Sequence, residues 1–516
     1  MKKRHLFPML LMICAALLMS LTTSCSDKDD DDNKTTPETP EEQQDIKMPE
    51  LKEDFESIVE WMTQAVKYCH PYISKFWNEE ANPANFNLLL VNGDRTKLYM
   101  INAEGKTEVP EKDWDEVLRD GMAQVETAGY FFLPFKNKHC CLQIVSQEMI
   151  KDMNEKSMMM TGKPLSMKQF CYEQLHTLYH ESFHEYVQKL NEWKKDSEDS
   201  SRDQVYPILY EPRIYRKMAL LALLKAWENP AEQSAQYARA KYWLQKYEKE
   251  CADEALSIKE TDVDESTAEY FCRSIIHSVF KDYDVLYGIK GKELSSGVSN
   301  ESYQQSIAMH LIYRDGRLNE AMPLLKKHEL TPINILLKNV TVPANYDESQ
   351  DAADIKMIRA ALDEQYTEAN PYMAPLIQLV NLHKQGKAVY VVTRRPGGAF
   401  YSSSAGTYTL TDLPGFVCEV NFAASFPEVE FRETTMLVYQ NIEHCIPVGS
   451  VDNLELSDWQ DLWQSDASFL GIECPRQATL NAVKGADTFE LKNLPVTVVV
   501  GKDALGNQYY CCRASY

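Results

Sequence analysis

The sequence predicts an α+β protein with a mainly helical first part, a small sheet near the start of that part, and a separate β-rich C-terminal part. Apolar residues recur every three or four positions over much of 166–384, as in amphipathic helices. Strand-like runs flank an Asn-Gly pair near residue 92, and many short strand-like runs separated by turn residues fill 388–516. A chain of 516 residues also exceeds what one hydrophobic core usually serves, so several domains are expected.

Residues 1–24 have the pattern of an export signal. A positive start at residues 2–4 precedes an apolar run from Leu6 to Leu21, which is short for a membrane span of ~20 residues. The small residues before Cys25 resemble a lipobox, in which the cysteine thiol is acylated and becomes the new N-terminus. We therefore expect a lipid on Cys25; a freely secreted protein cut nearby is the alternative.

The segment 25–48 is predicted to be a disordered acidic tether, because its Asp, Glu, Thr, Pro and Gln residues cannot form a core. Lys28 followed by acidic residues resembles the surface-export signal of some Gram-negative lipoproteins. That resemblance implies an outer-membrane protein, anchored by lipid and facing the cell exterior. A plain solvated tether is the alternative.

Charge and cysteine usage exclude some partners and sites. The net charge of −23 argues against binding nucleic acid or anionic lipid surfaces, so membrane contact is expected through the lipid only. Of thirteen cysteines, eleven remain once Cys14 leaves with the signal and Cys25 takes the lipid. The adjacent pairs Cys140-Cys141 and Cys511-Cys512 lie in apolar runs and are expected to be buried thiols rather than metal ligands.

The pattern along the chain predicts the order of elements. A helix is expected over 48–73, strands over 86–91 and 97–101 around the turn Asn92-Gly93-Asp94, and strands over 129–133 and 141–145. Helices are expected over most of 166–285, where Ser166 and Gln169 form a capping-box pair, and further helices at 301–314, 317–327 and 352–384. The composition changes near residue 385, which predicts domains at 49–385 and 386–516.

The strongest chemical signal is His180-Glu181-Ser182-Phe183-His184, an HExxH motif in a helical stretch. Residues four apart on a helix lie one turn apart, so both imidazoles can reach one zinc ion. Glu181 is turned by ~100° and can take a proton from the attacking water without being a ligand. The alternative is two histidines hydrogen-bonded in a core. His176 lies too far from His184 for one ion to bind all three, so it is a bystander or supports a ligand from behind.

A catalytic zinc ion needs a third protein ligand. The best candidate is Glu265, with Glu269 one turn later on a predicted helix orienting a ligand histidine. The alternative is that Asp262 and Glu265 only cap that helix. An oxyanion-stabilising group is also expected, but His277, Tyr303, His310 and Tyr313 are not distinguishable by sequence.

The order of a short sheet, HExFHxxxQ on a helix, and a later E[GS]xAEY resembles a family of gluzincin-type zinc metallopeptidases. His180, Glu181, Phe183, His184 and Gln188 match the first motif. Glu265, Ala268, Glu269 and Tyr270 match the second, with Ser266 where the family usually has Gly. The resemblance covers about residues 80–315. It implies a zincin-like domain over 49–385, with His180, His184 and Glu265 as zinc ligands, Glu181 as general base and Glu269 in support.

These features predict a zinc-dependent peptide-bond hydrolase that acts on peptide or protein substrates at the cell surface. One alternative is a surface binding or structural lipoprotein with a vestigial or structural zinc site, in which the C-terminal part binds glycan or protein. Glu181 favours catalysis, because a structural site needs no base there. The other alternative is a zinc hydrolase that acts on a non-peptide bond.

Overall fold

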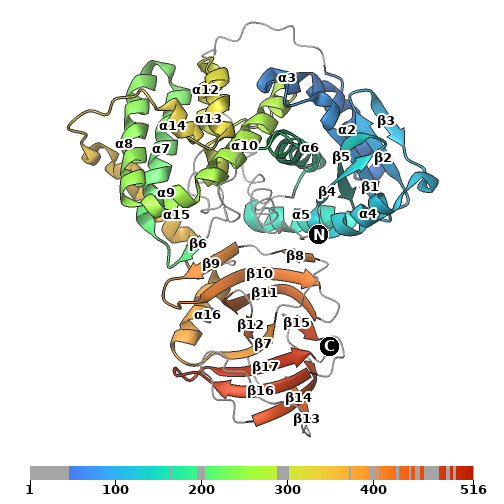
Figure 1. The fold of residues 1–516 in the computed structure, drawn as a ribbon, viewed down its shortest axis with the longest axis vertical. Coiled ribbons are helices and arrows are strands. Elements are labelled where there is room, and N and C mark those ends of the chain that lie inside the picture. The colour runs from blue at the N-terminus through green and yellow to red at the C-terminus, as the bar shows by residue number, and fades with distance from the viewer. Residues whose placement is uncertain are drawn as a thin grey trace.

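The structure, a computed structural model, describes residues 46–514 apart from a set of short gaps. The gaps are 162–163, 194–203, 287–300, 371–372, 395–400, 404–405, 426–428, 441–442, 448–453, 458–475, 484–488 and 492–495. The predicted signal, the lipidation site Cys25 and nearly all of the predicted tether lie outside the described residues. Figure 1 confirms the predicted α+β class, because a helical region and a separate sheet region follow one another along the longest axis.

The helical region begins with one helix packed on a five-stranded sheet. Helix α2 (Phe55–Cys69) starts at the N-cap Asp54, whose carboxylate accepts from the backbone N–H of Ser57, so the helix begins later than the predicted Met48. The sheet order is β3-β2-β1-β5-β4. Its strands are β1 (Asn87–Asn92), β2 (Leu98–Asn102), β3 (Gly105–Glu108), β4 (Tyr130–Phe135) and β5 (Lys138–Val145). The predicted strands and turn are thus confirmed, and β4 forms one edge.

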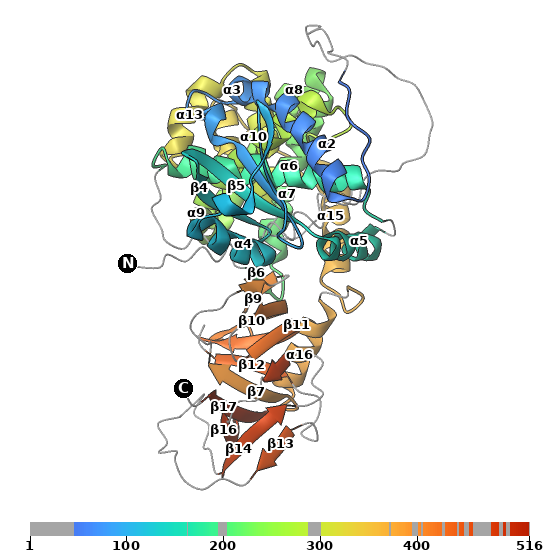
Figure 2. The same cartoon turned by 90° about the vertical axis from the view of Figure 1, so that its right-hand side faces the viewer.

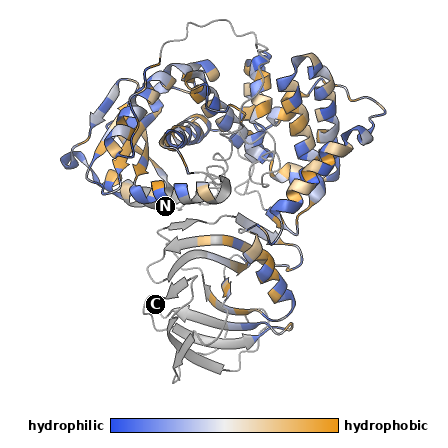
Figure 3. Cartoon of the chain, turned by 180° about the vertical axis from the view of Figure 1, so that it is seen from behind, coloured by the Kyte–Doolittle hydropathy of each residue, from blue (hydrophilic) through white to orange (hydrophobic). Residues whose placement is uncertain are grey.

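Helices build the rest of the helical region (Figure 1). The elements before the motif are α3 (Ile73–Phe76), α4 (Glu116–Ala128) and α5 (Gln147–Thr161). The later ones are α7 (Tyr210–Glu228), α8 (Gln233–Glu250), α9 (Ala252–Ser257), α11 (Glu301–Gln304), α12 (Ser306–Arg314), α13 (Leu318–Lys326), α14 (Pro332–Leu336) and α15 (Ala352–Gln365). Hydrophobic and hydrophilic residues alternate along these helices (Figure 3), which is the pattern of half-buried helices.

Two central helices carry the predicted site. Helix α6 (Met167–Phe183) starts at Ser166, where the predicted capping box with Gln169 is present, and continues into a π-helical turn over His184–Lys189. Helix α10 (Lys259–Val279) packs along it, and α7, α8, α9 and α15 lie on the side of α10 away from the five-stranded sheet (Figure 1). Every side chain of α6 from Phe170 onward and nearly all of α10 are buried. The polar residues of these helices are therefore enclosed by protein rather than exposed to water.

The sheet region contains helix α16 (Ala374–Lys384) and a twelve-stranded sheet. Met373, Leu376 and Leu379 share a core with strand residues such as Tyr390 and Tyr509. The strands are β7 (Val389–Arg394), β8 (Tyr401–Ser403), β9 (Gly406–Leu410), β10 (Phe416–Ser425), β11 (Val429–Tyr439), β12 (Glu443–Pro447), β13 (Leu454–Ser457), β14 (Arg476–Val483), β15 (Phe489–Leu491), β16 (Val496–Lys502) and β17 (Gln508–Ala514).

One strand from the helical part of the sequence belongs to this second sheet. Strand β6 (Gln204–Tyr206) pairs in parallel with β9, and Figures 1 and 2 both place this pair where the two regions meet. The expected helix over 352–384 is wrong as one element, because α15 and α16 are separate; Pro371 lies between them in the sequence, and a proline disfavours helix at the residue before it. Among the described residues, no helix is both long and apolar enough to cross a membrane.

Candidate metal centre

Helices α6 and α10 bring the three predicted metal ligands together. The Nε2 atoms of His180 and His184 are 3.0 Å apart, and they lie 3.2 Å and 3.4 Å from Oε2 of Glu265. All three side chains are buried. Donor atoms held by one zinc ion at ~2.0–2.2 Å in a tetrahedron stand roughly 3.3–3.6 Å apart. The triangle of these three atoms therefore has the size and chemistry of a metal site.

Neighbouring groups fix which ring nitrogen of each histidine faces the site. Nδ1 of His184 donates to Oε1 of Gln188 at 2.6 Å, and Gln188 in turn donates to the carbonyl of Asp264 and the hydroxyl of Thr267. Nδ1 of His180 lies 3.2 Å from Oε2 of Glu269. Because Nδ1 of His184 faces Gln188 and Nδ1 of His180 faces Glu269, Nε2 is the nitrogen of each ring that faces Glu265. Three electron-rich atoms then face one point, which favours a cation there.

The electrostatics favour a cation at the same point. Burial alone lowers the pKa of an imidazole, yet the pKa of His180 and that of His184 are raised, chiefly by Cys272 and Glu265 respectively. Burial alone also raises the pKa of a carboxyl group, yet the pKa of Glu265 is lowered by the two histidines. The negative field that attracts a proton also attracts a metal ion.

Glu181 lies beside this triangle but is not part of it. Its Oε1 is 3.9 Å from Nε2 of His180, and its Oε2 accepts a hydrogen bond from the hydroxyl of Tyr130 at 2.7 Å. Tyr130 begins the edge strand β4, and burial together with the charge of Glu181 raises the pKa of its phenol well above the ordinary value. The phenol therefore stays protonated and donates to the carboxylate, which fixes the orientation of Glu181.

Only one of the four candidates for an oxyanion-stabilising group lies at the site. The ring of Tyr303 stacks on His180 with centroids 5.6 Å apart. Burial, followed by the charges of Glu265 and Glu181, raises the pKa of Tyr303 well above the ordinary value, so its hydroxyl keeps its proton. In contrast, His277 contacts the carbonyl of Tyr283, while His310 and Tyr313 both pack on Tyr270.

Behind His180, four buried side chains form a second group that could hold a metal ion. The group is defined here as the second cluster and consists of His176, His180, Glu269 and Cys272. Nε2 of His176 lies 2.8 Å from Oε2 of Glu269, while Arg273 forms an ion pair with the other carboxylate oxygen. His176 is thus neither a bystander nor a ligand of the first triangle; it contacts the same carboxylate oxygen as His180.

A set of buried charges holds α10 from its other side. Both terminal nitrogens of Arg216 donate to the carboxylate of Asp262, at 2.8 and 2.9 Å, and its Nε donates to Glu301 at 2.8 Å. Ser302 donates to Asp262 at 2.6 Å. Asp262 lies in the first turn of a helix whose N-cap is Ile258, and its carboxylate binds Arg216 and Ser302, so the alternative that it only caps this helix does not hold.

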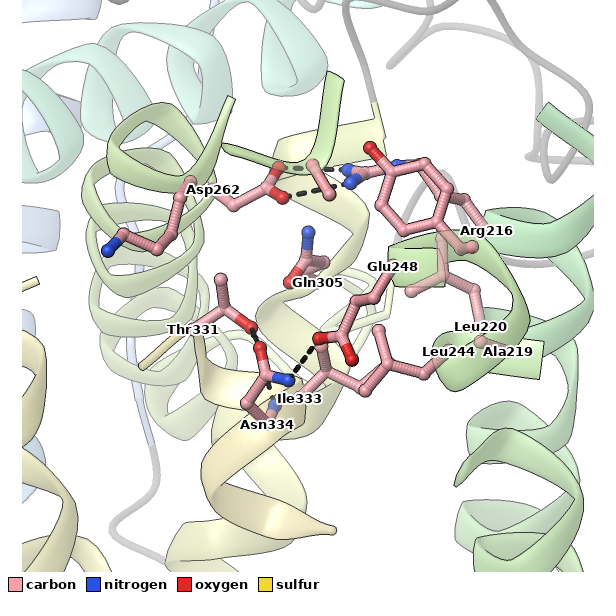
Figure 4. A pocket seen from close by; sticks show the side chains of 13 residues that line it. Arg216, Ala219, Leu220, Leu244, Glu248, Asp262, Gln305, Thr331, Ile333 and Asn334 are labelled. Carbon is pink, nitrogen blue, oxygen red and sulfur yellow. Dashed lines mark hydrogen bonds and ion pairs between the residues drawn. The ribbon is translucent and has the colours of Figure 1, made fainter. Parts of the chain in front are cut away.

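A cavity of about 80 Å³ lies between α7, α8 and α10 (Figure 4). Arg216 and Asp262 stand at one end, and a chain of hydrogen bonds from Thr331 through Asn334 to Glu248 lines the other. None of the residues of the first triangle or of the second cluster lines this cavity. It is therefore separate from the candidate metal centre.

Sequence reasoning did not identify Tyr130, Cys272 or Arg216. Tyr130 and Arg216 reach their partners from elements whose positions depend on the tertiary fold. Cys272 did leave a signal, because Glu269 and Cys272 are three apart on α10, while His176 and His180 are four apart on α6. Such spacings place each pair on one helix face.

Comparisons with known proteins add no further assignment, because no family model, no curated protein and no solved structure matches the chain. The described residues by themselves show a buried His–His–Glu–Cys cluster that could bind a metal ion.

Proposed function

We propose that the protein is a zinc-dependent peptide-bond hydrolase of the gluzincin type, with His180, His184 and Glu265 as the metal ligands. The observation that carries this proposal is the triangle of their three donor atoms, with sides of 3.0–3.4 Å, next to a carboxylate that does not join it. Two imidazoles and one carboxylate form a donor set that suits zinc and leaves a fourth position open. When bound, the ion polarises a substrate carbonyl and makes water more acidic.

The chain's own residues supply the proton transfers. Glu181 is the general base: it takes a proton from the attacking water and later returns it to the leaving amine. The hydroxyl of Tyr130 holds Glu181 in place. The hydroxyl of Tyr303, beside His180, is the group best placed to donate a hydrogen bond to the oxygen that becomes negative. Gln188 and Glu269 hold the imidazoles of His184 and His180 from behind.

The test is peptide cleavage by Glu181→Gln at a zinc content equal to that of the wild type. General acid–base catalysis is worth ~10²–10⁴-fold, so cleavage falls by about that factor while zinc stays bound. The matched control is Glu185→Gln, which removes a partly exposed carboxylate from the same segment, paired with Lys189, and leaves cleavage unchanged. His184→Ala and Glu265→Ala lose both zinc and cleavage.

Two outcomes count against the proposal. Equal cleavage by Glu181→Gln and wild type places the reaction elsewhere. If the zinc-loaded wild type cleaves no peptide of a broad library, the protein is not a peptidase. The alternatives are then a binding lipoprotein or a hydrolase of a non-peptide bond.

The cellular location of the protein is also a proposal, based on residues 1–48 of the sequence. A lipid on Cys25 and the acidic tether would hold the two folded regions at the outer membrane, facing the exterior. Cys25→Ala is expected to move the protein from the membrane fraction to the soluble fraction without changing its unfolding curve, because the tether contributes no core. A variant that stays wholly in the membrane fraction would show that the signal segment itself is the anchor.

A further inference from the structure

The donor atoms of the second cluster lie close to the spacing that a tetrahedral metal site requires. Oε2 of Glu269 lies 2.8 Å from Nε2 of His176, 3.2 Å from Nδ1 of His180 and 3.9 Å from the sulfur of Cys272. All four donor atoms lie within 4.8 Å of one another. Bonds of ~2.0–2.3 Å in a tetrahedron place donor atoms roughly 3.3–3.8 Å apart, so small side-chain shifts would close this group around one ion.

The contact between His180 and Glu269 gives a second, independent indication. Nδ1 of His180 is buried, and at 3.2 Å from the carboxylate it makes no hydrogen bond of good geometry to any described residue. A buried ring nitrogen left in this state is costly. It is aimed into the group formed by His176, Glu269 and Cys272, where an ion would give it a partner.

We propose that His176, His180, Glu269 and Cys272 bind a second transition-metal ion, and that His180 bridges the two ions through its two ring nitrogens. The proposal rests on the proposed function only through His180, which both sites share. Thiolate and imidazole ligands favour zinc, cobalt or copper(I) over magnesium or calcium. The first triangle, in contrast, contains no sulfur ligand, so a thiolate–metal bond identifies the second site alone.

The charge of the second ion can be compensated locally. Cys272 must lose its thiol proton, which it now directs at the carbonyl of Glu269, and the bridging imidazole of His180 must lose its remaining N–H proton. These two protons leave to solvent and match the charge of a divalent ion. Glu269 and Arg273 already compensate one another. The site thus takes an ion without leaving a net charge buried, and binding at the two sites is coupled through the shared ring.

The test uses cobalt(II) as the probe on the full chain, purified and freed of metal with a chelator. Cobalt is added stepwise while the near-ultraviolet thiolate-to-cobalt absorption and the bound cobalt per chain are measured. We expect two cobalt ions per chain, with the sulfur absorption saturating with one of them. Cys272→Ser removes the absorption and one ion, whereas His184→Ala keeps the absorption and loses the other ion.

Cys171→Ser is the matched control, because Cys171 is a buried free thiol on α6 outside the second cluster, and its removal leaves the absorption intact. If Cys272→Ser fails to fold by circular dichroism, His176→Gln gives the same information by weakening the absorption. One cobalt per chain without sulfur absorption in the wild type overturns the proposal. Sulfur absorption in a protein that does not cleave peptides supports the second site and counts against the proposed function, so the two failures are distinct.

Discussion

The helical region and the sheet region bury polar side chains of different kinds. Around α10 the helical region encloses charges of both signs, defined here as the α10 ion cluster: Arg213, Arg216, Lys217, Asp262 and Glu301. Among the residues of the sheet region whose burial the structure describes, the buried polar side chains are His383, Thr434, His444 and Asn507, none of which carries a fixed charge. Removing an ion from water costs several kcal/mol unless its partners compensate. The stability of the helical region therefore depends on pairing of buried charges, whereas the sheet-region residues of described burial include no buried charged side chain.

The α10 ion cluster lies next to the elements that carry the candidate metal centre. Asp262 lies about one turn before Glu265 on α10, and Ser302, which binds Asp262, is next to Tyr303 on α11. The α10 ion cluster thus fixes the two elements that carry a proposed ligand and the proposed oxyanion donor. Sites of this kind need their supporting side chains held by packing and hydrogen bonds.

The largest effect that separates the two regions is expected from Arg216→Met. The change removes both hydrogen bonds from Arg216 to the buried carboxylate of Asp262 and keeps the one from Ser302. Breaking a buried ion pair by removing one partner costs ~3–5 kcal/mol. Urea unfolding gives the loss in free energy, and hydrogen exchange by mass spectrometry locates it in α7, α10 and α11.

The matched control for Arg216→Met is Lys384→Met in the sheet region. Lys384 pairs with Asp412 where both side chains are exposed, and exposed pairs contribute ~0–1 kcal/mol. Equal losses from the two variants would remove the contrast between the regions, because burial of the charges would then make no difference.

The next largest effect tests whether the sheet region depends on close backbone packing instead. Gly386 ends α16 with a φ of +67°, and a Cβ there would lie 1.8 Å from the carbonyl oxygen of Leu505. Left-handed backbone costs a residue other than glycine ~1–2 kcal/mol, and steric overlap adds ~1–3 kcal/mol. We therefore expect Gly386→Ala to destabilise the sheet region by ~2–5 kcal/mol in urea unfolding.

Gly316 in the helical region separates the two contributions. Its φ is +69°, but a Cβ there would meet nothing within 4 Å. Gly316→Ala is therefore expected to cost only the ~1–2 kcal/mol of backbone strain. A loss at Gly386 no larger than that at Gly316 would show that Leu505 moves away freely and that packing is loose at this point.

The sequence was sufficient to predict the fold class and most elements, because helices and strands leave periodic patterns. The predicted helix bounds are wrong where a capping residue or a proline limits a helix within a continuous apolar pattern. Asp54 caps α2 after the apolar pattern has begun, and the stretch 352–384 holds two helices rather than one. The parallel pairing of β6 with β9 could not be predicted, because it joins residues about two hundred apart in the sequence.

At the site, the HExxH spacing predicted which residues share a helix face, and the structure places Glu265 beside them. The zinc ion, the ligand roles and the peptidase activity remain predictions. Tyr130 was not predictable, because an aromatic residue in a strand has the same pattern whether it packs in a core or donates to Glu181. The π-helical turn that begins at His184 also left no periodic signal, although such turns are frequent at functional sites.

The smallest expected effect concerns a feature that the two regions share, a buried neutral histidine. Burial, followed by the charge of Arg273, lowers the pKa of His310 from 6.5 to about 3, and burial also lowers the pKa of His383. In both cases the unfolded chain binds a proton that the folded chain does not. Stability is therefore fully present above pH ~6.5 and is lost as the pH falls below that value.

At pH 5.5, one unit below the unfolded pKa, the loss from His310 is ~1.4 kcal/mol. The measurement is urea unfolding at pH 8 and pH 5.5 with a chelator present at both, so that loss of metal does not contribute. His310→Gln should reduce the difference in unfolding free energy between pH 8 and pH 5.5 by about that amount. His383→Gln should also reduce this difference. The exposed His139→Gln keeps the wild-type difference. If the difference in unfolding free energy is the same in His310→Gln as in the wild type, His310 binds its proton in the folded protein. Burial, Arg273 and His277 would then not lower its pKa.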